Sequence, residues 1–142
     1  MTALRTAIVQ AFPVDAPPKE ILEAPEPYME EYFSGRRSDD CSPRDLRAFG
    51  ESLGFFSTEA WCYYMPAFML AHLDDPKASD HIGQAICIHL LNTEPHELAV
   101  KLSRLTQAQR QVIAEFVYEI GPVVLGDPRE VRAIIGKMEN AL

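Results

Sequence analysis

The sequence is poor in the residues from which small metal-binding, disulfide-rich or membrane proteins are built. It has three cysteines and no C-x-x-C pair, and an odd number of widely spaced thiols predicts neither a disulfide framework nor a zinc site. No apolar run approaches the roughly 20 residues that a membrane-spanning helix needs. Basic side chains are also few: 13 Lys and Arg stand against 21 Asp and Glu, for a net charge of −8. Such a chain repels phosphate, so we expect it to bind neither nucleic acid nor an anionic membrane.

Catalytic and nucleotide-binding motifs are incomplete wherever they begin. Gly121 and Gly126 have the spacing of a phosphate-binding loop, but Asp127 occupies the position of its lysine. A zinc-protease motif begins at His96, but Val100 replaces its second histidine. Neither G-x-G-x-x-G nor G-x-S-x-G occurs. The sequence therefore predicts no catalytic residue and no cofactor, and it favours a protein that is not an enzyme.

The histidines are the remaining candidates for a metal or polar ligand site. His72, Asp75, Asp80 and His81 can converge across the turn between two helices. They lack the spacing of known metal ligands, so no metal site is predicted. His89 lies in an apolar run, which is typical of a core histidine that is hydrogen-bonded to the backbone.

The longest apolar stretch, from Ala60 to Ala71, predicts a buried helix at about 57–75. Ser57 is a suitable N-cap for it. One apolar stripe follows helical spacing and consists of Trp61, Tyr64, Met65, Phe68, Met69 and His72. The opposite side is apolar as well, which indicates burial on most of the circumference. Pro66 removes one backbone hydrogen bond in the middle of the helix and predicts a kink.

The same stretch resembles the signature of an uncharacterised bacterial family of small proteins, a domain-of-unknown-function family whose pattern is close to F-L-T-P-E-A-F-R-Y-Y-L-P-A-F-L-L. The shared residues are Phe56, Glu59, Ala60, Tyr63, Tyr64, Pro66, Ala67 and Phe68. The segment from Leu105 to Ile120 is similar to a second block of that family, and the resemblance covers about 4–120. The family has no assigned activity, so the resemblance implies none. Cys62 stands where the family has arginine, so any site built on that arginine is not shared.

Helical patterns on both sides of the central segment alternate with connections rich in proline. Further helices are expected at about 2–12, 43–53, 77–91, 96–105, 106–120 and 128–140. Five prolines between positions 13 and 27 predict an irregular arm, which extends to about residue 42. Gly121 and Pro122 are expected to end the helix before them and to open a short apolar linker. The prediction is an all-α fold, a single domain of six to seven helices around the buried helix at about 57–75.

Two interpretations of function remain open. Small size, an acidic surface and the missing catalytic set favour a cytoplasmic protein-binding module of accessory, inhibitory or immunity type. The N-terminal segment has no signal-peptide pattern, which agrees with that location. The alternative is a small-molecule-binding or enzymatic helical domain with a pocket near the Pro66 kink, lined by Tyr63, Tyr64 and His72. Aromatic residues at helical spacing are more often core packing. A homodimer that buries residues 28–33 is a third interpretation.

Overall fold

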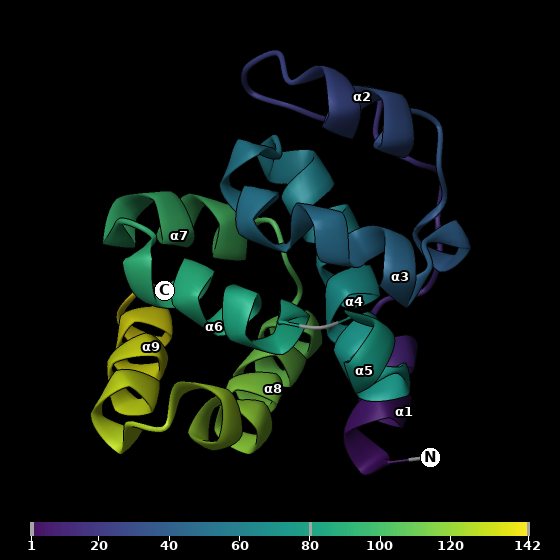
Figure 1. The fold of residues 1–142 in the computed structure, drawn as a ribbon. Helices are drawn as coiled ribbons and strands as arrows, with labels where there is room; N and C mark the ends of the chain where they lie inside the picture. Colours follow the sequence, from purple (N-terminus) through teal and green to yellow (C-terminus); the bar gives the residue numbers. More distant parts are fainter. Residues whose placement is uncertain (1, 80, 142) are drawn as a thin grey trace.

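The computed structural model describes residues 2–79 and 81–141, and this part of the chain is all-helical, as predicted (Figure 1). The elements are α1 (Ala3–Ala11), α2 (Pro27–Phe33), η1 (Ser38–Asp40), α3 (Pro43–Leu46), η2 (Arg47–Phe55), α4 (Thr58–Asp74), α5 (Pro76–Ser79), α6 (Ile82–Asn92), α7 (Pro95–Ser103), α8 (Gln107–Leu125) and α9 (Pro128–Asn140). The two η elements are 3-10 helices. Within the described ranges, extended pairing is confined to one isolated bridge between Leu22 and Phe56. None of the helices described is long and apolar enough to cross a membrane.

Helix α4 lies at the centre of the fold, which confirms the prediction of a buried helix at about 57–75. The Ser57 side chain accepts a hydrogen bond from the backbone N–H of Ala60 at 3.1 Å and caps its first turn. The side chains of Trp61, Tyr64 and Phe68 are 0% exposed. The helix contacts α1, α3, α5, α6, α7 and η1, so neighbours cover it on most sides. It remains one helix across Pro66.

The helix expected at 43–53 is instead a short α-helix, α3, followed by the longer 3-10 helix η2. Glycine is a poor α-helix former, and η2 contains Gly50 and Gly54. A Cβ atom on Gly50 would lie 3.3 Å from Cβ of Ala85. The missing side chain therefore allows η2 to approach α6 closely.

The single helix expected at 77–91 is also divided, into α5 and α6. Helix α5 packs against α3, whereas α6 crosses α4 and α8. The apolar side chains of Ile82, Ile86 and Leu90 on α6 are at most 1% exposed. The two helices thus pack against different neighbours, and the prediction of one helix at 77–91 is wrong.

Helix α8 passes through Gly121 and Pro122 and ends at Leu125, so the predicted linker is wrong. A Cβ atom on Gly121 would lie 3.0 Å from Cγ2 of Val131, which shows that this glycine makes room for α9. The residue that ends the helix is Gly126, whose φ of 73° is the left-handed conformation of a C-terminal cap.

The arm predicted at about 13–42 leaves the helical core and returns to it through α2 and η1 (Figure 1). The backbone N–H of Ser57 donates to the carbonyl of Ile21 at 2.8 Å, which ties the arm to the start of α4. Phe33 at the end of α2 is 0% exposed and enters the core, whereas Tyr28 is 76% exposed. Within the segment 28–33, Phe33 therefore packs in the core while Tyr28 lies at the surface.

Candidate functional site

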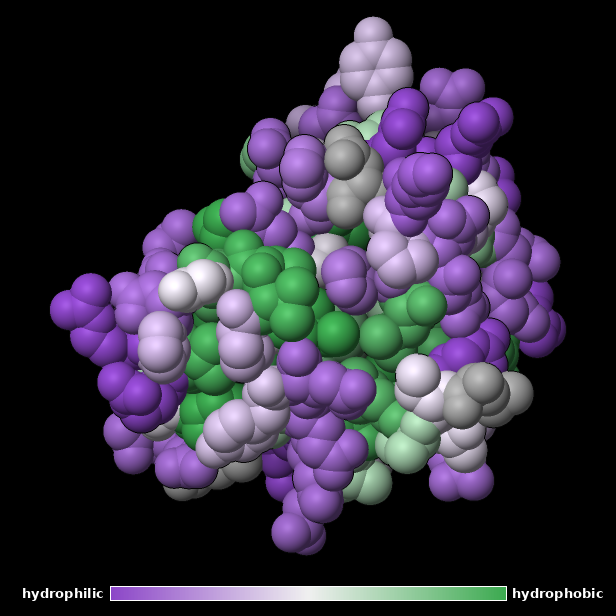
Figure 2. All heavy atoms as spheres, turned by 60° about the horizontal axis from the view of Figure 1, so that its bottom comes forward, coloured by the Kyte–Doolittle hydropathy of each residue, from purple (hydrophilic) through white to green (hydrophobic). Residues whose placement is uncertain are grey.

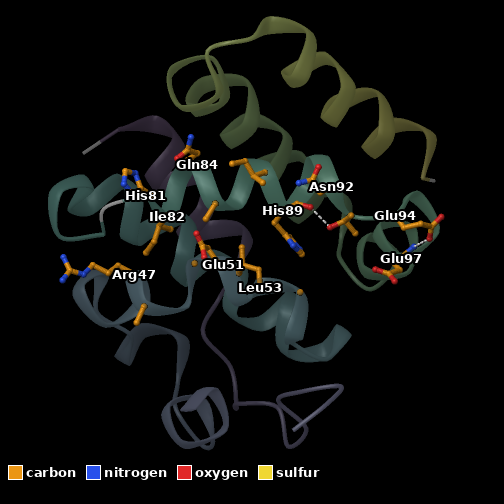
Figure 3. A pocket seen from close by; sticks show the side chains of 16 residues that line it. Arg47, Glu51, Leu53, His81, Ile82, Gln84, His89, Asn92, Glu94 and Glu97 are labelled. Atoms are coloured by element: carbon orange, nitrogen blue, oxygen red, sulfur yellow. Dashed lines mark hydrogen bonds between the residues drawn. The ribbon is translucent and has the colours of Figure 1, made fainter. Parts of the chain in front are cut away.

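A cavity of about 810 Å³ lies between η2 and α6 and reaches the beginning of α7; we call it the η2–α6 groove (Figure 3). Its apolar wall is contributed by Leu53, Ile82, Ala85 and Ile88. Ile88 is 40% exposed, although it belongs to a helix whose other isoleucines are buried. The groove therefore presents apolar surface to solvent at a place where two helices diverge.

Two glycines of η2, Gly50 and Gly54, line the groove on the side that faces α6. At Gly50 the two elements are close, since a Cβ there would lie 3.3 Å from Cβ of Ala85. At Gly54 they are farther apart, since the nearest atom to a Cβ there would be Cε1 of His89 at 4.0 Å. Gly50 therefore permits the close approach of η2 to α6, and Gly54 adds no side chain to the groove beside His89.

Charged side chains border the groove unevenly (Figure 3). Arg47 lies at one end, Glu94 and Glu97 lie at the other, and Glu51 lies between them. Glu94 caps α7, and hydrogen bonds from the backbone of His96 and Glu97 lower the pKa of its carboxyl group. Three carboxylates and one guanidinium thus line the groove, and two of the carboxylates lie next to α7, where the positive charge of Lys137 also lowers the pKa of Glu94.

His89 projects from α6 into the space between α6 and η2 and is fixed by the single tryptophan of the chain (Figure 3). Nε1 of Trp61 lies 2.8 Å from Nε2 of His89. An indole nitrogen can only donate, so Nε2 of His89 accepts the hydrogen bond and carries no proton. In the neutral ring the proton is therefore on Nδ1. From the sequence, the ring of His89 is expected to be hydrogen-bonded to the backbone. This expectation is wrong, because the ring is hydrogen-bonded to the side chain of Trp61.

The surroundings of His89 keep its ring neutral. Burial first, and then the positive charges of Lys101 and Lys137, together lower the pKa of His89 to about 4. Nζ of Lys137 donates to the carbonyl oxygens of Leu90, Leu91 and Thr93 at 2.6, 2.6 and 2.7 Å, so this charge is held at the end of α6. Near pH 7 the groove wall therefore presents an uncharged imidazole.

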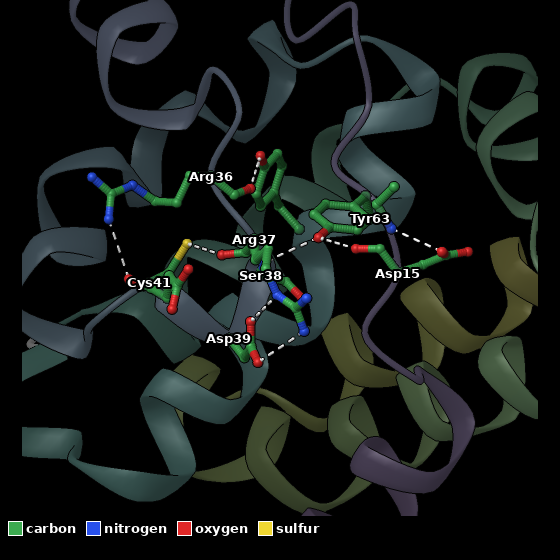
Figure 4. Close-up of polar contacts among 10 residues, drawn as sticks. Asp15, Arg36, Arg37, Ser38, Asp39, Cys41 and Tyr63 are labelled. Carbon is green, nitrogen blue, oxygen red and sulfur yellow. Dashed lines mark hydrogen bonds and ion pairs between the residues drawn. The ribbon is translucent and has the colours of Figure 1, made fainter.

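Tyr63 and Tyr64, predicted to bind a ligand, contact the arm. The hydroxyl of Tyr63 accepts from the backbone N–H of Ser38 at 3.2 Å and donates to the carbonyl of Asp15 at 2.8 Å (Figure 4). The hydroxyl of Tyr64 lies 2.8 Å from the carbonyl oxygen of Phe33 and 2.7 Å from that of Arg36. Both hydroxyls thus hold backbone groups of the arm against α4.

His72, the third residue of that predicted site, lies in the last turns of α4, away from the two tyrosines. Its ring packs on Phe116 with the centroids 5.9 Å apart. A Cβ on Gly83 would lie 2.5 Å from Nδ1 of His72, so only glycine fits there. Nδ1 is buried and has no hydrogen-bond partner among the described residues. None of the three residues lines the η2–α6 groove.

The candidate metal ligands can be compared only in part, since Asp80 lies outside the described residues. Within 2–79 and 81–141, no three His, Cys, Asp or Glu side chains are placed to hold a metal ion. His81 lines the groove, whereas His72 does not. Burial raises the pKa of the Cys41, Cys62 and Cys87 thiols to about 12, 11 and 12, so these thiols stay protonated near neutral pH.

A second apolar area lies on the face where α1 meets α8 and where α8 ends (Figure 2). Hydrophobic side chains gather there over a broad, shallow surface. Val123 is 82% exposed and Tyr118 is 58% exposed. Glu115 and Glu119 at its border are also exposed, so their orientation is less restricted than that of His89. This face lacks the combination of a fixed polar group and an apolar wall that distinguishes the groove.

Reasoning from sequence did not identify the groove. Gly50 and Gly54, four residues apart in a helical pattern, were the available signal, because small residues at that spacing permit a close approach of another helix. Ile88 was a second signal, since it lies on the opposite side of α6 from Ile82 and Ile86. The contact between Trp61 and His89 had no signal, because no local spacing relates residues on different helices.

The chain belongs to a family of unknown function, DUF6714, whose model matches residues 20–128. The match includes the whole η2–α6 groove and the contact between Trp61 and His89, whereas Lys137 lies beyond it. No curated protein and no solved structure matches the chain.

Proposed function

We propose that the chain is a cytoplasmic protein-binding module whose η2–α6 groove receives a cationic amphipathic helix of a partner protein. The observation that carries this proposal is the combination of an apolar wall around Ile88 with an acidic border. A helix with leucine-like residues on one side and lysine or arginine beside them would cover the apolar wall and pair with the carboxylates. This is the helix-in-groove mode of recognition.

The size and charge of the groove support such a partner. Helix α6 has 11 residues and is therefore about 16 Å long, which matches three turns of a bound helix. Glu51, Glu94 and Glu97 attract basic side chains, and Arg47 at the other end opposes them. This asymmetry favours one orientation of the partner, with its most basic part next to α7. The net charge of −8 would also accelerate the encounter with a cationic partner.

A small-molecule pocket at Pro66 is the second candidate, and the packing around that residue supports it less. Pro66 is buried inside α4, and it lines neither the η2–α6 groove nor the apolar face between α1 and α8. The hydroxyls of Tyr63 and Tyr64 are engaged with backbone groups of the arm. For a homodimer that buries residues 28–33, Tyr28 is 76% exposed and open to a second copy, whereas Phe33 is already buried in the core.

The test is a titration with a defined peptide. The probe is a 14-residue helical peptide with leucine at positions i, i+3, i+4 and i+7 and lysine beside them. The control is a second peptide of the same composition, in which the residues are reordered so that the helix has no apolar face. We expect saturable one-to-one binding of the first peptide in calorimetry. The substitution Ile88→Lys should weaken binding of the first peptide at least tenfold, because the new lysine places a positive charge on the apolar wall.

The matched control is Val9→Lys on α1. Val9 is 46% exposed and Ile88 is 40% exposed, so both changes add one charge at a similarly exposed apolar position. The Val9 variant should bind as the wild type does. Equal weakening by both variants, or equal binding of the two peptides, would reject the groove as the binding site.

A further inference from the structure

The η2–α6 groove contains one polar donor whose direction is fixed by the interior of the protein. Nε2 of His89 accepts the indole N–H of Trp61 at 2.8 Å, so Nδ1 is the nitrogen that carries the proton. Trp61 is 0% exposed and cannot move without disrupting the core. The ring of His89 is therefore held in one orientation and one tautomer before any ligand arrives.

Nδ1 of His89 is open to a ligand. His89 lines the groove, and the ring is directed from α6 toward η2 (Figure 3). No described residue hydrogen-bonds to Nδ1, and the only buried nitrogen or oxygen left unpaired in the described side chains belongs to His72. Nδ1–H of His89 thus retains contact with solvent and is available as a donor.

The charges around the groove restrict the acceptor that this donor can meet. Glu51, Glu94 and Glu97 border the same groove and would repel a carboxylate that entered it. A second donor, such as a lysine ammonium, would face the N–H of His89 unfavourably. The acceptor that fits both conditions is a neutral oxygen, such as the side-chain amide of glutamine or asparagine.

We propose that Nδ1–H of His89, oriented by Trp61, selects partner helices that place a glutamine or asparagine amide among the apolar residues facing α6. The inference rests on the proposed function, since it names the specificity-determining residue of the same groove. A partner with leucine at that position leaves a desolvated N–H unpaired and binds more weakly. A partner with glutamine at that position accepts a hydrogen bond from the N–H of His89.

The first test uses two peptides that differ at one position. Both are the 14-residue leucine–lysine helix described above, with either glutamine or leucine at the central position of its apolar face. The wild-type protein should bind the glutamine peptide about fivefold more tightly, which is the effect of one net hydrogen bond. Equal affinities, or tighter binding of the leucine peptide, would overturn the inference while leaving the proposed function intact. Absence of saturable binding by either peptide would reject the function itself.

Two substitutions separate the donor from the structural contact. In His89→Asn the amide nitrogen can occupy the place of Nδ1, whereas in His89→Gln the amide oxygen can occupy the place of Nε2 and accept from Trp61. The preference for the glutamine peptide should survive in His89→Asn and disappear in His89→Gln. A merely structural role would give the opposite order, since His89→Gln preserves the contact with Trp61. Urea unfolding of both variants identifies the fraction that is folded in each titration.

Discussion

Helix α4 uses polar aromatic side chains in different ways where it meets the arm and where it meets α6. On the arm side, the hydroxyls of Tyr63 and Tyr64 bond to backbone groups of the arm at 2.7–3.2 Å. On the groove side, the indole of Trp61 bonds to the side chain of His89, whose second nitrogen faces a cavity. The arm side is hydrogen-bonded within the chain, whereas the groove side retains an unpaired donor next to exposed apolar surface.

The difference separates stability from recognition. A polar group that is paired inside the protein contributes to folding and to the choice of one structure, but it offers nothing to a ligand. A polar group that is oriented by the core and open at its other end can bind a partner without a large loss of conformational entropy. Substitutions on the two sides should therefore affect different measurements.

The largest expected effect is that of Trp61→Ala. This change removes a side chain that is 0% exposed and leaves Nε2 of His89 without its donor. Urea unfolding should show a loss of about 3–5 kcal/mol in the free energy of unfolding. A loss below about 1 kcal/mol would mean that α4 is not the centre of the core.

The second effect is a dependence of stability on pH. The pKa of His89 is lowered to about 4 in the folded protein, from an unperturbed value of about 6.5. The unfolded chain therefore binds a proton between these values while the folded protein does not. This contribution to stability is complete above pH 6.5 and decreases toward pH 4, by up to about 3 kcal/mol.

His89→Gln isolates that effect, because glutamine does not titrate. The pKa of His72 is also lowered by burial, but His72 is present in both proteins and its contribution cancels. Unfolding measured at pH 7 and pH 4.5 should show the wild type losing stability relative to the variant. Parallel losses in the two proteins would show that His89 is not held neutral.

The third prediction concerns the arm side. Tyr64→Phe removes the hydroxyl that lies 2.8 Å from the carbonyl oxygen of Phe33 and 2.7 Å from that of Arg36. The free energy of unfolding should decrease by about 1–2 kcal/mol, because a backbone acceptor is left unpaired. Peptide affinity should not change. A change in affinity larger than twofold would contradict the separation of the two sides.

The smallest expected effect is that of a single charge at the border of the groove. Glu51→Lys should weaken the leucine–lysine peptide about five- to tenfold at low salt, and the loss should shrink at high salt because the charges are screened. Glu139→Lys on α9 is the matched control, since Glu139 is exposed and does not line the groove. Equal losses in the two variants would mean that net charge, rather than the groove, attracts the peptide.

The sequence predicted the elements that depend on local signals and missed those that depend on distant contacts. Ser57 caps its helix as expected, because capping is decided within four residues. Gly121 was misread as the end of a helix, since its role is to make room for Val131 of the next helix. The end is instead Gly126, and both residues have the same local appearance.

The candidate site was predicted in the wrong part of α4 for the same reason. Tyr63 and Tyr64 are prominent in the sequence, but the backbone groups that they bind come from residues 25 or more positions away. Trp61 and His89 are 28 residues apart, and only the crossing of α4 and α6 brings them together. Side-chain pairs of this kind follow from packing and have no pattern along the chain.

The most direct test of the account is a two-dimensional NMR titration of the 15N-labelled protein with the glutamine-containing peptide. The account predicts that shift changes gather on the backbone amides of Gly50, Gly54 and Ile88, on the indole N–H of Trp61 and on Nδ1 of His89. The amides of the arm, including Ser38, should remain unchanged. Shift changes that gather on the arm or on the face between α1 and α8, with the groove unaffected, would contradict it.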